Sequence, residues 1–263
     1  MTKTSKHLWA EITNFETLHR AYLMARRGKR YSDGVLRFSC DLENQLLQLQ
    51  SALREDEYAI GEYHTFWVTD PKARQVAALP FRDRVVQHAL MLIIEPIWES
   101  RFIHDSYACR VAKGTHAGAD RLTAFLRRAH RMWPNIYVLK ADIQSYFASI
   151  DHSVLRGLIQ RRIACCRTMQ LINIIIDSWQ QDLGVGIPIG NLSSQMFANI
   201  YLHELDMYVK HVLHERFYMR YMDDFIILSD NKARLNVTKE RLRVFLHDCL
   251  RLSLNRNTRI FPA

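Results

Sequence analysis

The chain has 263 residues, and its 48% hydrophobic content is enough for one large domain or two packed ones. Its 36 lysines and arginines against 27 acidic residues give a net charge of +9, which favours a polyanionic partner such as nucleic acid. The cysteines show no spacing typical of disulfide pairs, no apolar run is long enough to span a bilayer, and no signal-peptide pattern is found. These features argue against a secreted or a membrane protein, so we expect a cytoplasmic one.

Helical periodicity dominates the first hundred residues. The pattern Thr13-Asn14-Phe15-Glu16 is a capping box, and the helix that it opens is predicted to end at Arg26-Arg27-Gly28. A second helix is predicted from Asp41, with one apolar face made of Leu42, Leu46, Leu49 and Leu53. A third helix is predicted over 83–97, with a buried face made of Val86, Leu90, Ile93 and Ile97. Pro96 and the following Trp98 are expected to stop it.

The second half of the chain mixes helices with short apolar runs. Helices are predicted over 153–163, 169–179, 191–212 and 233–250. The helix over 191–212 is expected to bury Met196, Ile200 and Leu205. Together with the apolar runs, these elements predict a protein of mixed helices and strands.

Two adjacent carboxylates, Asp223 and Asp224, stand between β-prone arms at 217–220 and 225–229. Aromatic and β-branched residues around a short polar break predict a hairpin that lifts both side chains to the rim of a sheet. Adjacent carboxylates repel each other, so a fold that keeps them together favours a cation there. Taken alone, the motif also fits a solvated turn without a ligand.

A third carboxylate, Asp142, ends the apolar run that begins at Val138. A buried strand would bring it beside the hairpin pair, although a lone Asp can also cap a strand end. Three carboxylates can hold two Mg²⁺ ions about 3.5–4 Å apart for in-line phosphoryl transfer. One ion would activate an attacking 3′-hydroxyl, and the other would neutralise the leaving pyrophosphate.

These motifs resemble those of reverse transcriptases along nearly the whole chain. Segment 142–147 is similar to the family's first palm motif, and Tyr221 to Asp224 is similar to its catalytic hairpin. Segments 74–89, 106–110 and 113–118 resemble the fingers of the bacterial, group II-intron-like branch. The resemblance implies an α/β (α+β) right-hand polymerase with fingers and palm, and two Mg²⁺ ions at Asp142, Ile143, Asp223 and Asp224.

Segment 186–195 narrows the branch, because Ile189 and Gln195 stand where most reverse transcriptases have Gln and Pro. This pattern is similar to the enzymes of diversity-generating retroelements, which copy a template RNA into cDNA with frequent errors opposite adenine. Ile189 has no amide to hold the sugar and template, which is a physical route to low fidelity. Gly190 permits close backbone approach to the base pair, and Gln195 is expected to orient the start of the following helix.

The resemblance also assigns contacts to the incoming nucleotide. Phe147 is expected to act as a steric gate against a 2′-hydroxyl, with core packing as the alternative. Arg74 and Lys72 are expected near the triphosphate, because guanidinium and ammonium groups suit phosphate oxygens. Solvated side chains are the alternative for both. Candidates for contact with nucleic acid are Arg82, Arg84, Arg110, Lys113 and Tyr221, with a structural ion pair as the alternative for Arg84.

The expected domain order follows from the same resemblance. It is 1–63 for the helical start of the fingers, 64–134 for the fingers, 135–152 for the palm, 153–183 for a fingers insertion and 184–263 for the palm. Family members continue beyond segment 252–263 with a further palm strand and a helical thumb. Neither is expected in this chain.

The favoured function is therefore an error-prone RNA-directed DNA polymerase. Its expected partners are a template RNA and primer, dNTPs and a small basic accessory protein, in an oligomeric assembly without a membrane. A retron, intron-type or phage-defence reverse transcriptase is the alternative among enzymes. A non-catalytic RNA-binding scaffold is the alternative outside enzymes, and the three retained carboxylates argue against it.

Overall fold

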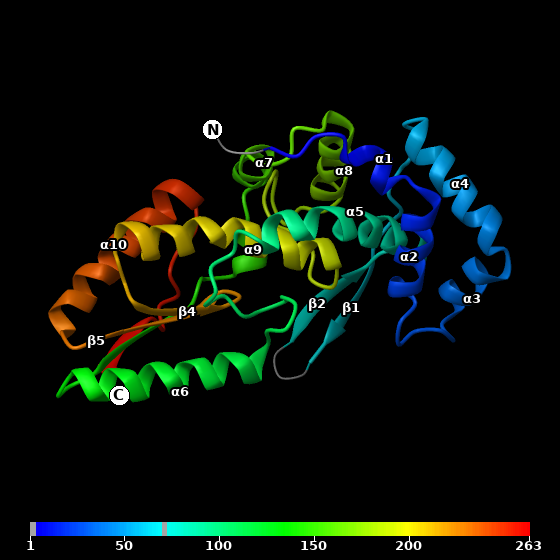
Figure 1. Cartoon of the computed structure of the whole chain (residues 1–263). Helices are drawn as coiled ribbons and strands as arrows, with labels where there is room; N and C mark the ends of the chain where they lie inside the picture. The colour runs from blue at the N-terminus through cyan, green and yellow to red at the C-terminus, as the bar shows by residue number, and fades with distance from the viewer. Residues whose placement is uncertain (1–3, 70–72) are drawn as a thin grey trace. The chain divides into compact units, whose positions relative to one another are not determined.

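The computed structural model describes residues 4–69 and 73–263, which form two compact units. Unit 1 comprises Met1–Ser100 and Arg156–Met196, and unit 2 comprises Arg101–Leu155 and Phe197–Ala263. Both units contain helices and strands, as Figure 1 shows, so the predicted mixed fold class is confirmed. No helix among the described residues is both long and apolar enough to cross a membrane.

Unit 1 is mainly helical, and its longest helix, α5 (Phe81–Glu99), packs against α2 (Phe15–Ala25). Strands β1 (His64–Val68) and β2 (Arg74–Ala78) form an antiparallel hairpin in which every β1 side chain is exposed. The remaining helices of this unit are α1 (Leu8–Ile12), α3 (Asp33–Cys40), α4 (Leu42–Arg54), most of α7 (His152–Gln160) and α8 (Cys166–Asp177).

Two predicted helix ends in unit 1 are wrong. The N-cap of α2 is Asn14 rather than Thr13, because the Asn14 side chain accepts a hydrogen bond from the Glu16 N–H at 2.9 Å. The Thr13 hydroxyl instead donates to the Trp9 carbonyl of the preceding helix. Helix α5 continues past Pro96 to Glu99, because proline removes only its own N–H from the helix, and the Pro96 carbonyl still accepts a hydrogen bond from the Ser100 N–H.

The buried face of α5 is also rotated from the predicted one. Val86, Leu90, Ile94 and Trp98 are buried at a spacing of four residues. Ile93 and Ile97, which were expected on this face, are only half-buried. Spacings of three and of four residues both fit one face of an α-helix, so the sequence does not decide between Ile93 and Ile94 after Leu90.

Unit 2 is built on a four-stranded antiparallel sheet with the order β4-β5-β3-β6. The strands are β3 (Tyr137–Ala141), β4 (Phe217–Tyr221), β5 (Asp224–Ser229) and β6 (Arg259–Pro262). In Figure 1, α6 (Thr115–Met132) lies along one face of this sheet, and α9 (Leu192–Met207) and α10 (Lys232–Leu250) lie on the other. A cluster with α6 buries Val138, Phe217 and Leu228 from the strands.

The strand β6 lies in segment 252–263, for which the sequence predicts no strand. Residues Arg259–Pro262 pair with β3, and Val138 stands opposite Phe261. The strand is only four residues long with no fully buried side chain, so its sequence gives a weak periodic signal. The predicted hairpin and the long helix are confirmed, because β4 and β5 pair and α9 continues into a π-helical turn at Tyr208–Val212.

Candidate metal centre

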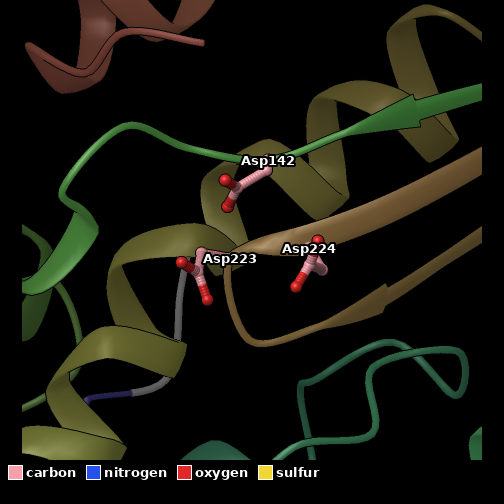
Figure 2. Close-up of side chains that lie close together, drawn as sticks. All are labelled: Asp142, Asp223 and Asp224. Atoms are coloured by element: carbon pink, nitrogen blue, oxygen red, sulfur yellow. The ribbon is translucent and has the colours of Figure 1, made fainter. Parts of the chain in front are cut away.

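The register of the central strands brings the three predicted carboxylates together in unit 2. The pairing of β3 with β5 ends at Ala141 opposite Phe225, so the next residues, Asp142 and Asp224, face each other beyond it. Asp223 precedes Asp224 in the turn of the β4–β5 hairpin. One oxygen from each of the three carboxylates lies within 4.8 Å of the others. Figure 2 shows the three side chains around a common space.

The electrostatics of this cluster favour a bound cation. Partial burial, together with the negative charges of Asp142 and Asp224, raises the pKa of Asp223 to about 6, against a backbone hydrogen bond that lowers it. A divalent cation would relieve this repulsion. Carboxylate oxygens are the donors that Mg²⁺ prefers, so the residues present fit that ion.

Asn255 anchors the carboxylate of Asp142, and the sequence did not suggest this role. Its Nδ2 donates to Asp142 Oδ2 at 2.9 Å, and its backbone N–H donates to the Asp142 carbonyl at 2.7 Å. An isolated bridge between Ile143 and Leu254 joins the same two segments. Asn255 therefore fixes both the backbone and the side chain of Asp142, with a neutral amide that adds no charge of its own.

A fully buried arginine supports the turn that bears the other two carboxylates. Arg220 of β4 has no exposed surface, and its Nε and Nη2 donate to the two oxygens of Asp206 at 2.8 and 2.6 Å. Its Nη1 donates to the Met222 carbonyl at 2.9 Å and to Asn199 Oδ1 at 3.2 Å. The Tyr218 hydroxyl donates to the same Asp206 at 2.6 Å. Every polar group of this buried network has a partner, which is the condition for tolerating a buried charge.

Left-handed backbone conformations occur on both sides of the triad. Met222, immediately before Asp223, has φ of 55°, and Ser145, three residues after Asp142, has φ of 47°. Such conformations cost energy in residues other than glycine, and they concentrate at functional sites. The Arg220 hydrogen bond to the Met222 carbonyl therefore supports a residue with a costly backbone conformation.

Phe147 lies in the 3₁₀ turn that follows Ser145, at residues Tyr146–Ser149. Its side chain is half-buried and meets the ring of Tyr146 edge-on at 5.7 Å between centroids. Tyr146 is buried and donates from its hydroxyl to the Ala198 carbonyl at 2.6 Å. Phe147 thus rests on a fixed neighbour and keeps part of its ring accessible, which a gate would require.

The remaining predicted residues of unit 2 bind other parts of the protein. Ile143 is buried, and Arg110 donates to the carbonyls of Ile103 and Ser106 at 2.6 and 2.9 Å. Lys113 donates to the His104 carbonyl at 3.0 Å. The Tyr221 hydroxyl lies 3.1 Å from Thr115 Oγ1 at the start of α6. Contacts of Arg110, Lys113 and Tyr221 with nucleic acid stay predictions.

Most predicted nucleotide contacts belong to unit 1. Arg74 is exposed at the start of β2, and Gln195 is exposed in α9. The Ile189 carbonyl accepts a hydrogen bond from the Ala77 N–H of β2 at 2.8 Å, while its side chain is 36% exposed. Gly190 has φ of +117°, and a Cβ there would lie 2.7 Å from Val76 Cγ1, so β2 itself requires the glycine.

Three further basic residues, Arg82, Arg84 and Lys72, were predicted to contact phosphate. The Arg82 guanidinium lies over the ring of Tyr58 at 5.2 Å. Arg84 forms no predicted ion pair among the described residues; its Nε donates to the Leu79 carbonyl at 3.0 Å, and burial lowers its pKa. Lys72 lies outside the residues that the structure describes. Contacts of these residues with phosphate stay predictions.

Residues 69–257 match the family model described as reverse transcriptase (RNA-dependent DNA polymerase). Protein YkfC of Escherichia coli is 29% identical over 82% of this chain and 68% of its own length. The group II intron-encoded protein LtrA of Lactococcus lactis is 27% identical over 64% of this chain, which matches only 28% of LtrA.

A solved structure supports the fold independently of sequence. The apo telomerase from Candida tropicalis, truncated from its C-terminal domain, superposes with a TM-score of 0.54 at 12% identity. The match covers 82% of this chain and 54% of the telomerase chain. This similarity supports a fingers and palm arrangement of helices and strands.

Proposed function

The chain belongs to the reverse transcriptase family, and we propose that it extends a DNA primer on an RNA template at the Asp142, Asp223 and Asp224 centre. The observation that supports this site most directly is the convergence of three carboxylate oxygens within 4.8 Å on the rim of the unit 2 sheet. The chain matches only part of LtrA and of the telomerase chain, so template, primer and partners belong to the proposal.

The three aspartates would hold the divalent cations, with two Mg²⁺ ions as the proposed occupancy. When bound, the ions would lower the pKa of the primer 3′-hydroxyl and neutralise the leaving pyrophosphate. The protein's part is to hold its ligands in place before the substrate arrives. Asn255 orients Asp142, and Arg220 holds the turn that precedes Asp223. Such preorganised polar groups need no rearrangement as charge develops.

We propose two separate contacts with the incoming deoxynucleotide, one with its triphosphate and one with its sugar. Arg74 would bind triphosphate oxygens through its planar guanidinium, together with Lys72. Phe147 would lie under the sugar and exclude a 2′-hydroxyl. Under this proposal the unit 2 sheet is the palm, and the helices and hairpin of unit 1 include the fingers.

For the biological role, we favour an error-prone enzyme of a diversity-generating retroelement. The support is the resemblance of segment 186–195 to those enzymes, since Ile189 and Gln195 stand where most reverse transcriptases have Gln and Pro. The exposed Ile189 side chain offers no hydrogen bond to a sugar or a template base. A small basic accessory protein, an oligomeric assembly and a structured template RNA belong to this role.

An intron-type reverse transcriptase is the second candidate, because one of the similar proteins is intron-encoded LtrA. The two roles differ in fidelity. An intron-type enzyme should copy adenine as accurately as other template bases, whereas a diversity-generating enzyme should misincorporate mainly opposite adenine. Sequencing cDNA made on one template of even base composition separates them.

The central experiment removes one metal ligand at a time. Asp223→Ala and Asp224→Ala should abolish Mg²⁺-dependent dNTP incorporation on an RNA template with a DNA primer, while circular dichroism shows a folded chain. Asp120→Ala is the matched control, because Asp120 is an exposed carboxylate on α6 of the same unit. Substantial incorporation by either ligand variant would remove the triad from the mechanism.

A further inference from the structure

Two basic side chains lie next to the triad on the same face of the unit 2 sheet. Lys140 of β3 stands directly opposite Arg259 of β6 in the strand register. Lys140 also precedes Asp142 by two residues, so strand alternation places its side chain on the face of the carboxylates. Two residues of a strand span about 6.8 Å, so this basic pair is within about one nucleotide of the triad.

The rest of the face explains why this pair stays accessible. Lys140 pairs on its other side with Ile226 of β5, which in turn pairs with Met219 of β4. The next row of side chains, which includes Val138 and Phe261, packs against the α6 cluster. Ile226 and Met219 also belong to the α6 cluster, so the basic pair occupies the β3–β6 end of a row that α6 covers at its β4–β5 end.

Lys140 and Arg259 have no acidic partner within residues 4–69 and 73–263. Both side chains are exposed, and within the described residues neither forms an ion pair or a side-chain hydrogen bond. The Arg259 guanidinium lies 5.6 Å from the centroid of Phe261, which orients it on this face. Two neighbouring cations without an acidic partner repel each other, so an anion bound between them would be favourable.

We propose that Lys140 and Arg259 bind the phosphodiester backbone of the strand being extended, close to its 3′ end. The proposal rests on the polymerase function assigned above. Three carboxylates by themselves repel a nucleic-acid backbone, and a basic pair one step away offsets that repulsion where the primer end must approach. Neighbouring strands are about 4.8 Å apart, so two cations side by side suit oxygens of one or two successive phosphates.

The incoming triphosphate is a different ligand for the same charges. We assign it instead to Arg74 of β2, because that residue lies in the motif that resembles the fingers. Binding of the primer backbone and binding of the triphosphate predict different effects of substituting Lys140 or Arg259. If the pair binds the primer backbone, the substitution changes the Kd for primer–template measured without dNTP. If the pair binds the triphosphate, the substitution changes the KM for dNTP.

The test uses the full chain with Lys140→Gln, Arg259→Gln and the double variant. Fluorescence anisotropy measures the Kd for a DNA primer annealed to an RNA template, without dNTP, across a series of KCl concentrations. Each single substitution should raise the Kd roughly three- to tenfold and reduce the slope of log affinity against log salt by about one. Lys140→Arg should keep the wild-type slope, because it keeps the charge.

Arg241→Gln is the matched control, since it removes one exposed positive charge from α10 on the other side of the sheet. Its salt slope should stay at the wild-type value. A wild-type Kd and slope for Lys140→Gln and Arg259→Gln would overturn the proposal. An unchanged Kd with a raised KM for dNTP would also overturn it, in favour of the triphosphate. Failure of the polymerase function would appear differently, as wild-type protein that binds primer–template but incorporates no dNTP.

Discussion

The Arg220 guanidinium donates a hydrogen bond to the Met222 carbonyl at 2.9 Å, so a cation with no exposed surface holds the turn in front of Asp223. The same guanidinium forms a two-point ion pair with Asp206. Burial would lower the pKa of Arg220, but the negative charge and the hydrogen bonds of Asp206 keep it above its ordinary value. The turn of the metal centre and the interior of unit 2 therefore share one polar network.

Removing one partner of this network should destabilise the fold. Arg220→Met leaves Asp206 buried without its cation, which should lower the free energy of unfolding by about 3–5 kcal/mol. Urea denaturation followed by circular dichroism measures the change. The double variant Arg220→Met with Asp206→Leu should recover much of the loss, because it removes both charges. A single variant that loses less than about 1 kcal/mol would contradict a structural role.

Asp223→Asn should remove a pH dependence from the metal-free protein. Burial and the neighbouring carboxylates raise the folded pKa of Asp223 to about 6, above the ordinary value near 3.9 for an unfolded chain. Ionisation of Asp223 therefore opposes folding. The protonated carboxyl favours the folded state, and this contribution to the free energy of unfolding is lost as the pH rises from about 4 to about 6. Thermal unfolding in EDTA across that range should show a smaller decline for Asp223→Asn than for wild type. Equal declines would mean that Asp223 titrates normally.

Asn255→Ala should weaken metal binding without unfolding the chain. The substitution removes the Nδ2 donor that orients Asp142 but leaves the backbone hydrogen bond in place. Loss of such a supporting hydrogen bond typically lowers metal affinity roughly 10- to 100-fold. A Mn²⁺ titration measures the affinity directly. Asn257→Ala is the control, since only the Asn257 backbone N–H contacts Asn255. Equal affinities for the two variants would contradict the positioning role.

The sequence predicted the ligands of the centre but not their supports. Asp142, Asp223 and Asp224 were accessible to prediction because two are adjacent and each follows or precedes a β-prone run. Asn255 lies 113 residues from Asp142, and no local pattern links them. Arg220 offered one clue, because a charged residue inside an apolar strand needs a buried partner. The sequence alone did not identify Asp206 as that partner.

Features of the fold that depend on a single contact or on tertiary pairing were also not predicted from the sequence. Long periodic segments such as α9 and α10 were predicted, because many residues contribute to one signal. The ends of α2 and α5 were wrong, since the choice between Thr13 and Asn14 depends on one hydrogen bond and Pro96 is tolerated in a final turn. The short strand β6 forms through its pairing with β3, which is a tertiary contact.

Phe147→Ala should admit ribonucleotides if the half-buried ring limits space under the sugar. The expected result is a rise in rNTP incorporation relative to dNTP, because removal of the ring opens room for a 2′-hydroxyl. Primer extension with each nucleotide class gives the ratio. Tyr146→Phe is the control, since it removes only the buried hydroxyl that donates to Ala198. An unchanged ratio in Phe147→Ala would leave the residue as a packing group.

Ile189→Gln tests the error-prone role with little risk to the fold. The Ile189 carbonyl is held by the Ala77 N–H, while the side chain is 36% exposed, so a glutamine amide can reach water and should cost little stability. If the missing amide loosens the nascent base pair, Ile189→Gln should lower misincorporation opposite adenine more than opposite other bases. Leu183→Gln is the control, because it makes a similar change at a side chain that is 93% exposed in the same unit. Sequencing cDNA from all three proteins on one RNA template gives the error rates. Equal errors opposite adenine in wild type and Ile189→Gln would remove this residue from fidelity control, and with it the main physical argument for mutagenic synthesis.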